Sequence, residues 1–137
     1  MSSFEANRLH ASDAARLAHA PRLAHAFGLY LRAASPAPAN ALAPAITEAA
    51  ATVVAAILAV ADRDGTGSAV AAFDALRQSG RGSPRNDAVM GHALIGALTD
   101  VLGAAFDETT REAWANGYVR LVETVMAARR NRMDFVA

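Results

Sequence analysis

The chain has 137 residues, enough to bury a hydrophobic core, and nothing in residues 1–137 marks a boundary between two domains. Thirteen basic residues balance thirteen acidic ones, so the formal net charge of zero predicts no general attraction to nucleic acid or to an anionic membrane. Cysteine is absent, which excludes disulfides, thiolate metal sites and thiol nucleophiles and agrees with a reducing compartment.

Neither an export signal nor a membrane span is expected. Residues 1–8 place no apolar run behind a basic head, as a secretory signal would. The longest apolar stretch, residues 49–61, is too short to cross a bilayer. These features predict a single soluble domain in the cytoplasm.

Most of the chain has the composition and periodicity of helix, since alanine dominates and has the highest helix propensity. A helix that begins at Pro21 should end before Pro36, because proline suits a first helical turn and disfavours the α conformation in the residue before it. The next helix is expected from about Ile46 to just before Gly65. A shorter one covers residues 68–78.

Two longer helices are predicted in the C-terminal half, and they carry the clearest apolar stripes. Each stripe recurs at helical spacing and needs an apolar surface opposite it. The stripes consist of Met90, Leu94, Leu98 and Val101 in the first helix and Trp114, Tyr118, Leu121 and Val125 in the second. We therefore predict an all-α fold of six to seven helices in which the last two long helices pack antiparallel.

The start of the last helix is expected near Asp107. Thr109 and Glu112 have the spacing of a capping box, in which the two side chains satisfy free N–H groups in the first helical turn. The preceding helix opens at Pro84, again a residue that suits a first turn.

Gly91 and Leu94, followed by Trp114 and Tyr118, have the residue types and spacing of the last two helices of bacterial globins. On these residues the chain resembles globins of the flavohaemoglobin type, and a thinner similarity reaches back to about Ala14. The resemblance implies a globin-like fold for the whole chain. It also implies a homodimer that uses parts of residues 91–129, because related globin modules dimerise through their last two helices.

The resemblance indicates a lost haem site as well. Arg77 stands where these globins have the proximal histidine, and Asp87 and Arg129 stand where a tyrosine and a glutamate orient that histidine. Five positions that surround haem in the family hold, in chain order, Gly28, Leu42, Ala49, Val53 and Arg77. Arginine is protonated at any working pH and offers iron no lone pair. We therefore predict neither a haem cofactor nor a metal site.

A vacated haem site leaves a ligand pocket as one possibility. Gly28, Ala49 and Val53 are small, which favours an open space among the helices, with Arg77 at its rim. An arginine fork at an apolar mouth suits the carboxylate of a small apolar ligand. The alternative is that Arg77 faces water near a helix C-terminus, where the helix dipole favours a cation.

No pair of acid and base and no activated nucleophile is evident, so we expect no enzyme. Three classes of function remain. The first is a haem-free globin-like module for binding or signalling. The second is a haem globin that binds oxygen or nitric oxide through an unusual axial ligand such as His92. The third is a structural helical domain with a filled core that binds a protein partner.

Overall fold

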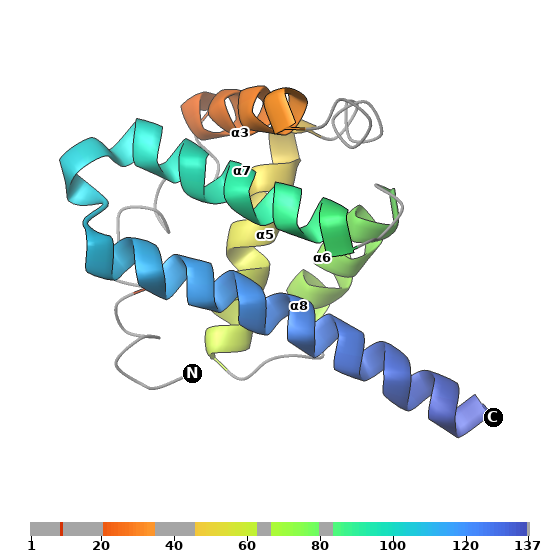
Figure 1. The fold of residues 1–137 in the computed structure, drawn as a ribbon. Coiled ribbons are helices and arrows are strands. Elements are labelled where there is room, and N and C mark those ends of the chain that lie inside the picture. Colours follow the sequence, from red (N-terminus) through yellow and green to blue (C-terminus); the bar gives the residue numbers. More distant parts are fainter. Residues whose placement is uncertain (1–8, 10–20, 35–45, 63–66, 80–83, 137) are drawn as a thin grey trace.

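The structure of the chain is a computed structural model that describes Leu9 and residues 21–34, 46–62, 67–79 and 84–136 (Figure 1). Among these residues, five α-helices and one short 3₁₀ turn have defined bounds, and there is no strand. The prediction of an all-α fold is confirmed. The expected number of helices was six to seven, and a helix before Pro21 would lie outside the described residues.

The helices begin close to the residues that the sequence indicated. Their bounds are α3 (Pro21–Ala34), α5 (Ile46–Ala61), α6 (Ser68–Ser79), α7 (Pro84–Leu102), η2 (Gly103–Ala105) and α8 (Glu108–Val136). Proline at the first position of α3 and α7 agrees with its preference for a first helical turn, where its missing N–H is no loss.

The helices surround α5, which contacts α3, α6 and α8. α5 consists almost entirely of alanine, valine, isoleucine and leucine, and a helix that is apolar on every side is stable only when neighbours cover it. α7 and α8 run antiparallel across it, and α3 lies along α7 (Figure 1). The antiparallel arrangement of the last two helices agrees with the prediction.

The apolar stripes of α7 and α8 face the interior, as predicted. Phe27 of α3, Phe73 of α6 and Trp114 of α8 are fully buried and are the largest such side chains in the described part of the chain. Tyr118 is also buried, so the interpretation of Trp114 and Tyr118 as core residues is confirmed. Burial of this kind is the main term that stabilises the fold.

A short reversal joins α7 to α8. Gly103 follows the last residue of α7 with φ of 55°, a left-handed conformation that glycine adopts without a steric penalty and that commonly ends a helix. Asp107 then caps α8, because its Oδ1 accepts a hydrogen bond of 2.8 Å from the N–H of Thr110. The helix starts where expected, but its cap is Asp107 and not the predicted capping box of Thr109 and Glu112.

Within the described residues, the segment Asn86–Ala105, most of it in α7, is long and apolar enough to cross a membrane by length and composition. Only 33 % of its most apolar window is buried inside the molecule. The core helix of a soluble protein meets the same criterion, so the finding is weak support for a membrane span. It does identify α7 as an apolar helix with much of its surface uncovered.

Candidate functional site

A buried ion pair joins the end of α6 to the start of α7. Nε of Arg77 donates to Oδ1 of Asp87 at 2.7 Å and Nη2 donates to Oδ2 at 2.8 Å, so the guanidinium and the carboxylate meet as two parallel forks. Arg77 is 3 % exposed and Asp87 is 7 % exposed. The helix dipoles favour this arrangement, because the cation lies in the last turn of one helix and the anion in the first turn of the next.

Other polar groups surround the guanidinium. Nη2 of Arg77 also lies 3.6 Å from Sδ of Met126, and Nη1 lies 3.7 Å from Oδ1 of Asp74. Oδ1 of Asp74 in turn accepts a longer hydrogen bond of 3.4 Å from Nε of Arg129 on α8. The hydrogen bonds to Asp87 raise the pKa of Arg77 above its ordinary value, so the guanidinium stays charged at any working pH.

Tyr118 connects α8 to the same corner. Its hydroxyl donates a hydrogen bond of 2.6 Å to the backbone carbonyl of Asp87, and its ring meets Phe73 edge to face with 6.0 Å between centroids. The ring lies directly against Gly91 of α7, where an added Cβ would stand 2.6 Å from Cε1 of Tyr118. Glycine at position 91 is therefore required for this close approach.

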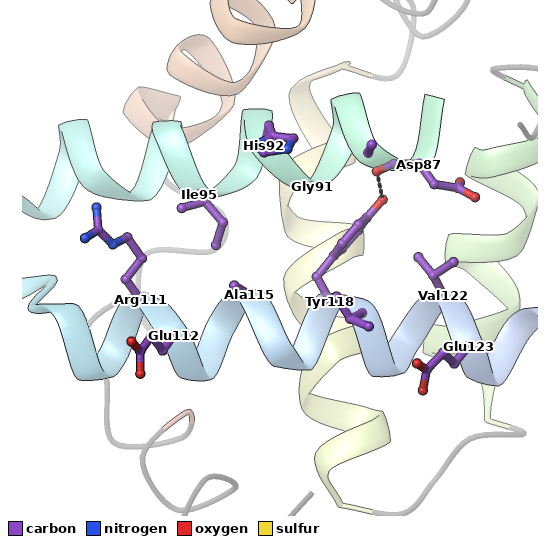
Figure 2. Close-up of a pocket in the computed structure, with 12 residues that line it drawn as sticks. Asp87, Gly91, His92, Ile95, Arg111, Glu112, Ala115, Tyr118, Val122 and Glu123 are labelled. Carbon is purple, nitrogen blue, oxygen red and sulfur yellow. Dashed lines mark hydrogen bonds between the residues drawn. The ribbon is translucent and has the colours of Figure 1, made fainter. Parts of the chain in front are cut away.

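A groove of about 600 Å³ opens between α7 and α8. Figure 2 shows Tyr118 reaching from α8 toward α7, with its hydroxyl directed at Asp87. The apolar lining consists of Ala88, Gly91 and Ile95 of α7 and Ala115, Tyr118, Val119 and Val122 of α8. We call this feature the α7–α8 groove.

Charged side chains stand at the two ends of the α7–α8 groove. Arg111 and Glu112, from the first turns of α8, lie at one end, and Glu123 lies towards the other (Figure 2). His92 of α7 lines the margin and is exposed. The site is therefore an apolar channel with polar ends, a form typical of binding surfaces.

Four of the five residues predicted to surround a ligand pocket are described, and they lie away from the lining of the α7–α8 groove. Gly28 is buried on α3, Ala49 and Val53 belong to the hydrophobic core on α5, and Leu42 lies outside the described residues. None of the described four lines the α7–α8 groove. Of all the residues that the sequence assigned to the lost haem site, only Asp87, the partner of Arg77, lines the groove.

The environment of the Arg77 side chain differs from both interpretations made from the sequence. The interpretation that it faces water is wrong, because the side chain is almost fully buried. The fork assigned to a ligand's carboxylate holds the carboxylate of Asp87. A ligand could take that place only by displacing Asp87, which would then lie buried without a partner.

The α7–α8 groove is not among the sites predicted from the sequence, although the sequence contains a signal for it. Ala115, Val119 and Val122 recur at helical spacing on α8, outside the stripe that begins at Trp114. A helix with a second apolar face needs a second apolar surface to cover it. Val119 is 54 % exposed, so the described part of this chain leaves that second face open.

We expect stability to fall above about pH 10 because of Tyr118, since burial and the nearby carboxylate of Asp87 raise the pKa of its hydroxyl in the folded state. The unfolded tyrosine ionises near its ordinary pKa of about 10. The contribution of Tyr118 is thus complete below that pH and is lost as the pH rises, by up to about 1.4 kcal/mol per pH unit.

Urea unfolding at a series of alkaline pH values measures this dependence. The variant Tyr118→Phe should lose most of the alkaline decline. Tyr30→Phe is the matched control, because a hydrogen bond to Asp100 raises the pKa of Tyr30 at an exposed position. An equal alkaline decline in the native chain and in Tyr118→Phe would contradict the prediction.

Comparison with protein-family models, curated proteins and solved structures finds no match for this chain. The globin-like interpretation therefore remains a prediction that rests on the quoted residues. In the described part of the chain, no three histidine, aspartate or glutamate side chains form a group that could hold a metal ion.

Proposed function

We propose that this chain is a haem-free binding module of globin-like architecture, and that it acts through the α7–α8 groove and not as an enzyme. The observation that carries the proposal is the groove itself, an apolar channel of about 600 Å³ on the outside of the helix pair. Binding sites in proteins commonly have this size and an apolar lining with a few polar groups.

The exposed apolar surface supports a binding role. Val119 of α8 is 54 % exposed, and Ile95 and Val122, which line the groove with it, are half-buried. Contiguous apolar surface with a polar margin often marks a site of interaction, whereas isolated exposed apolar residues do not. The groove is contiguous, since these side chains come from two neighbouring helices.

The polar groups beneath the groove support binding over catalysis. The hydroxyl of Tyr118 is held by the backbone carbonyl of Asp87, and both carboxylate oxygens of Asp87 accept hydrogen bonds from Arg77. Catalytic acids and bases need a free lone pair or proton directed at the substrate. These two groups instead fix the distance between α7 and α8 and so preserve the channel.

A fluorescent apolar anion, anilinonaphthalene sulfonate, tests the groove directly. The native chain at nanomolar concentration should bind the probe saturably, and Val119→Asp should abolish binding because it puts a charge in the apolar channel. Leu29→Asp on α3 is the matched control, since Leu29 is 51 % exposed and does not line the groove. Equal binding by Val119→Asp and the native chain would overturn the proposal.

A further inference from the structure

The floor of the α7–α8 groove repeats with the period of a helical turn. Its lining residues follow one another by three or four positions on each helix, and because the two helices run antiparallel, these residues meet in levels. Taken along α7, the levels pair Ala88 with Val122, Gly91 with Tyr118 and Ile95 with Ala115. Each level combines a small residue with a large one, so room for an incoming side chain recurs about every 5.4 Å along the floor.

An α-helix presents its side chains with the same period. Residues three and four apart lie on one face of a helix, so the apolar side chains of a third helix can enter successive levels of the floor. The groove is open beside Val119, which lines it and is 54 % exposed. Between Arg111 and Glu123, α8 rises about 18 Å, which is the length of a helix of about three turns.

The edge of the groove on the side of α8 is acidic. Glu112 and Glu123 line this edge, are exposed, and lie on the side of α8 away from α7 (Figure 2). Arg111 lies at the same end of the groove as Glu112, but its guanidinium is directed toward α7 (Figure 2). None of these three side chains makes an ion pair with another described residue.

The edge on the side of α7 has a different character. Asp87 lines the groove, but Arg77 holds both of its carboxylate oxygens. His92 is the other titratable side chain of α7 among the described lining residues, and it is exposed. Carboxylates without a partner are therefore found only along the α8 edge of the described lining, and the guanidinium of Arg111 points away from that edge.

We propose that the α7–α8 groove binds an amphipathic α-helix of a partner protein, with a large apolar side chain once per turn and basic side chains along one flank. The proposal rests on the binding role proposed above for the groove and names its occupant. The apolar face of the partner helix covers Val119, and its basic flank lies along Glu112 and Glu123. An acidic side chain on the opposite flank meets Arg111.

Charge distinguishes this occupant from the alternatives. An apolar small molecule provides no partner for Glu112, Glu123 or Arg111, and a lipid bilayer buries all three charges at a high cost. A second copy of this chain adds two more carboxylates and one more guanidinium at the same positions, so half of the carboxylates still have no base to pair with. A helix with a basic flank pairs both carboxylates of the edge.

Two synthetic peptides of about 14 residues, long enough to follow the whole groove as a helix, test the proposal. Both carry leucine once per turn on one face, and they differ only along one flank, where one has lysine and the other has glutamate. Either peptide can lie in both directions, so one flank is enough. Fluorescence polarisation should show saturable binding of the lysine peptide and at least about tenfold weaker binding of the glutamate peptide.

Variants of the chain locate the binding. Glu112→Gln/Glu123→Gln should weaken the lysine peptide by about three- to tenfold and remove its advantage over the glutamate peptide. Glu108→Lys is the matched control, because it changes the net charge of the chain by the same amount, and Glu108 is exposed on α8 without lining the groove. Val119→Asn should weaken both peptides to the same degree. Circular dichroism checks that each variant is folded.

The outcomes separate this inference from the proposed function. If the native chain binds anilinonaphthalene sulfonate through Val119 but binds both peptides equally or not at all, the partner helix is overturned and the groove remains a binding site. If sedimentation shows a dimer that Val119→Asn dissociates, the occupant is a second copy and the inference fails. An equal loss of lysine-peptide affinity in Glu108→Lys and in Glu112→Gln/Glu123→Gln also overturns it, because net charge then attracts the peptide.

Discussion

We expect Arg77→Met to lower the free energy of unfolding by about 3–5 kcal/mol, as is typical when one partner of a buried ion pair is removed. The variant leaves the carboxylate of Asp87 buried with neither of its two guanidinium hydrogen bonds. Domains of this size have a free energy of unfolding of about 5–15 kcal/mol, so the loss is a large share of the total. Urea unfolding followed by far-ultraviolet circular dichroism measures it.

Two further variants serve as controls for this experiment. Arg77→Met/Asp87→Leu should regain most of the lost stability, because it removes the unpaired charge and fills the same space with apolar atoms. Arg129→Met should cost less than about 1 kcal/mol, since Arg129 is 39 % exposed and its contact with Asp74 is longer, at 3.4 Å. A loss at Arg129 as large as that at Arg77 would show that burial does not determine the effect.

We also expect that the chain does not bind hemin at a specific site. Hemin titrated into the purified chain should give the broad, weak spectrum of free hemin, with no saturation at one haem per chain. α6 offers Phe73, Asp74, Arg77 and Gln78 in its second half, and none of these is an ordinary haem ligand. Arg77 could not serve in any case, because its guanidinium is protonated and bound to Asp87.

The hemin titration also tests the alternative function of an unusual haem globin. His92 is exposed on α7 beside the groove, whereas Met90 faces the core at 4 % exposure. A sharp five- or six-coordinate spectrum at one haem per chain would contradict the haem-free proposal. Its loss in His92→Ala, and its persistence in His25→Ala, would then identify His92 as the axial ligand.

Helix positions could be predicted from the sequence because their causes are local. Proline at positions 21 and 84 permits a helix to start but not to continue through it, and the starts of α3 and α7 agree. Periodic apolar residues likewise indicated which face of α8 would be buried. The cap of α8 was harder to predict, because Asp107 and Thr109 are both suitable residues and only the backbone path selects Asp107.

The pairing of Arg77 could not be predicted in the same way. An arginine at the end of a helix can face solvent, bind a ligand or pair with an acidic side chain. The residues around Arg77 in the sequence do not determine which of these occurs. The outcome depends on how α6 and α7 are placed relative to each other, which brings Oδ1 of Asp87 to 2.7 Å from Nε of Arg77. A contact between two helices depends on their relative placement, and the spacing of residues within each helix does not contain that information.

The sequence by itself determined the all-α class, the helix starts and the existence of two apolar faces on α8, since propensity and periodicity act within one helix. Only the tertiary structure decided that the face with Val119 would stay uncovered in the described part of the chain, whereas the face with Trp114 is covered as predicted. Trp114 and Tyr118 pack on the rest of the chain, while the ring of Tyr118 against Gly91 and its bond to Asp87 determine how closely α7 approaches α8. The distance between α7 and α8 leaves Val119 exposed and opens the groove between the two helices. A channel of this kind depends on how far apart the helices pack, which the sequence of each helix does not specify.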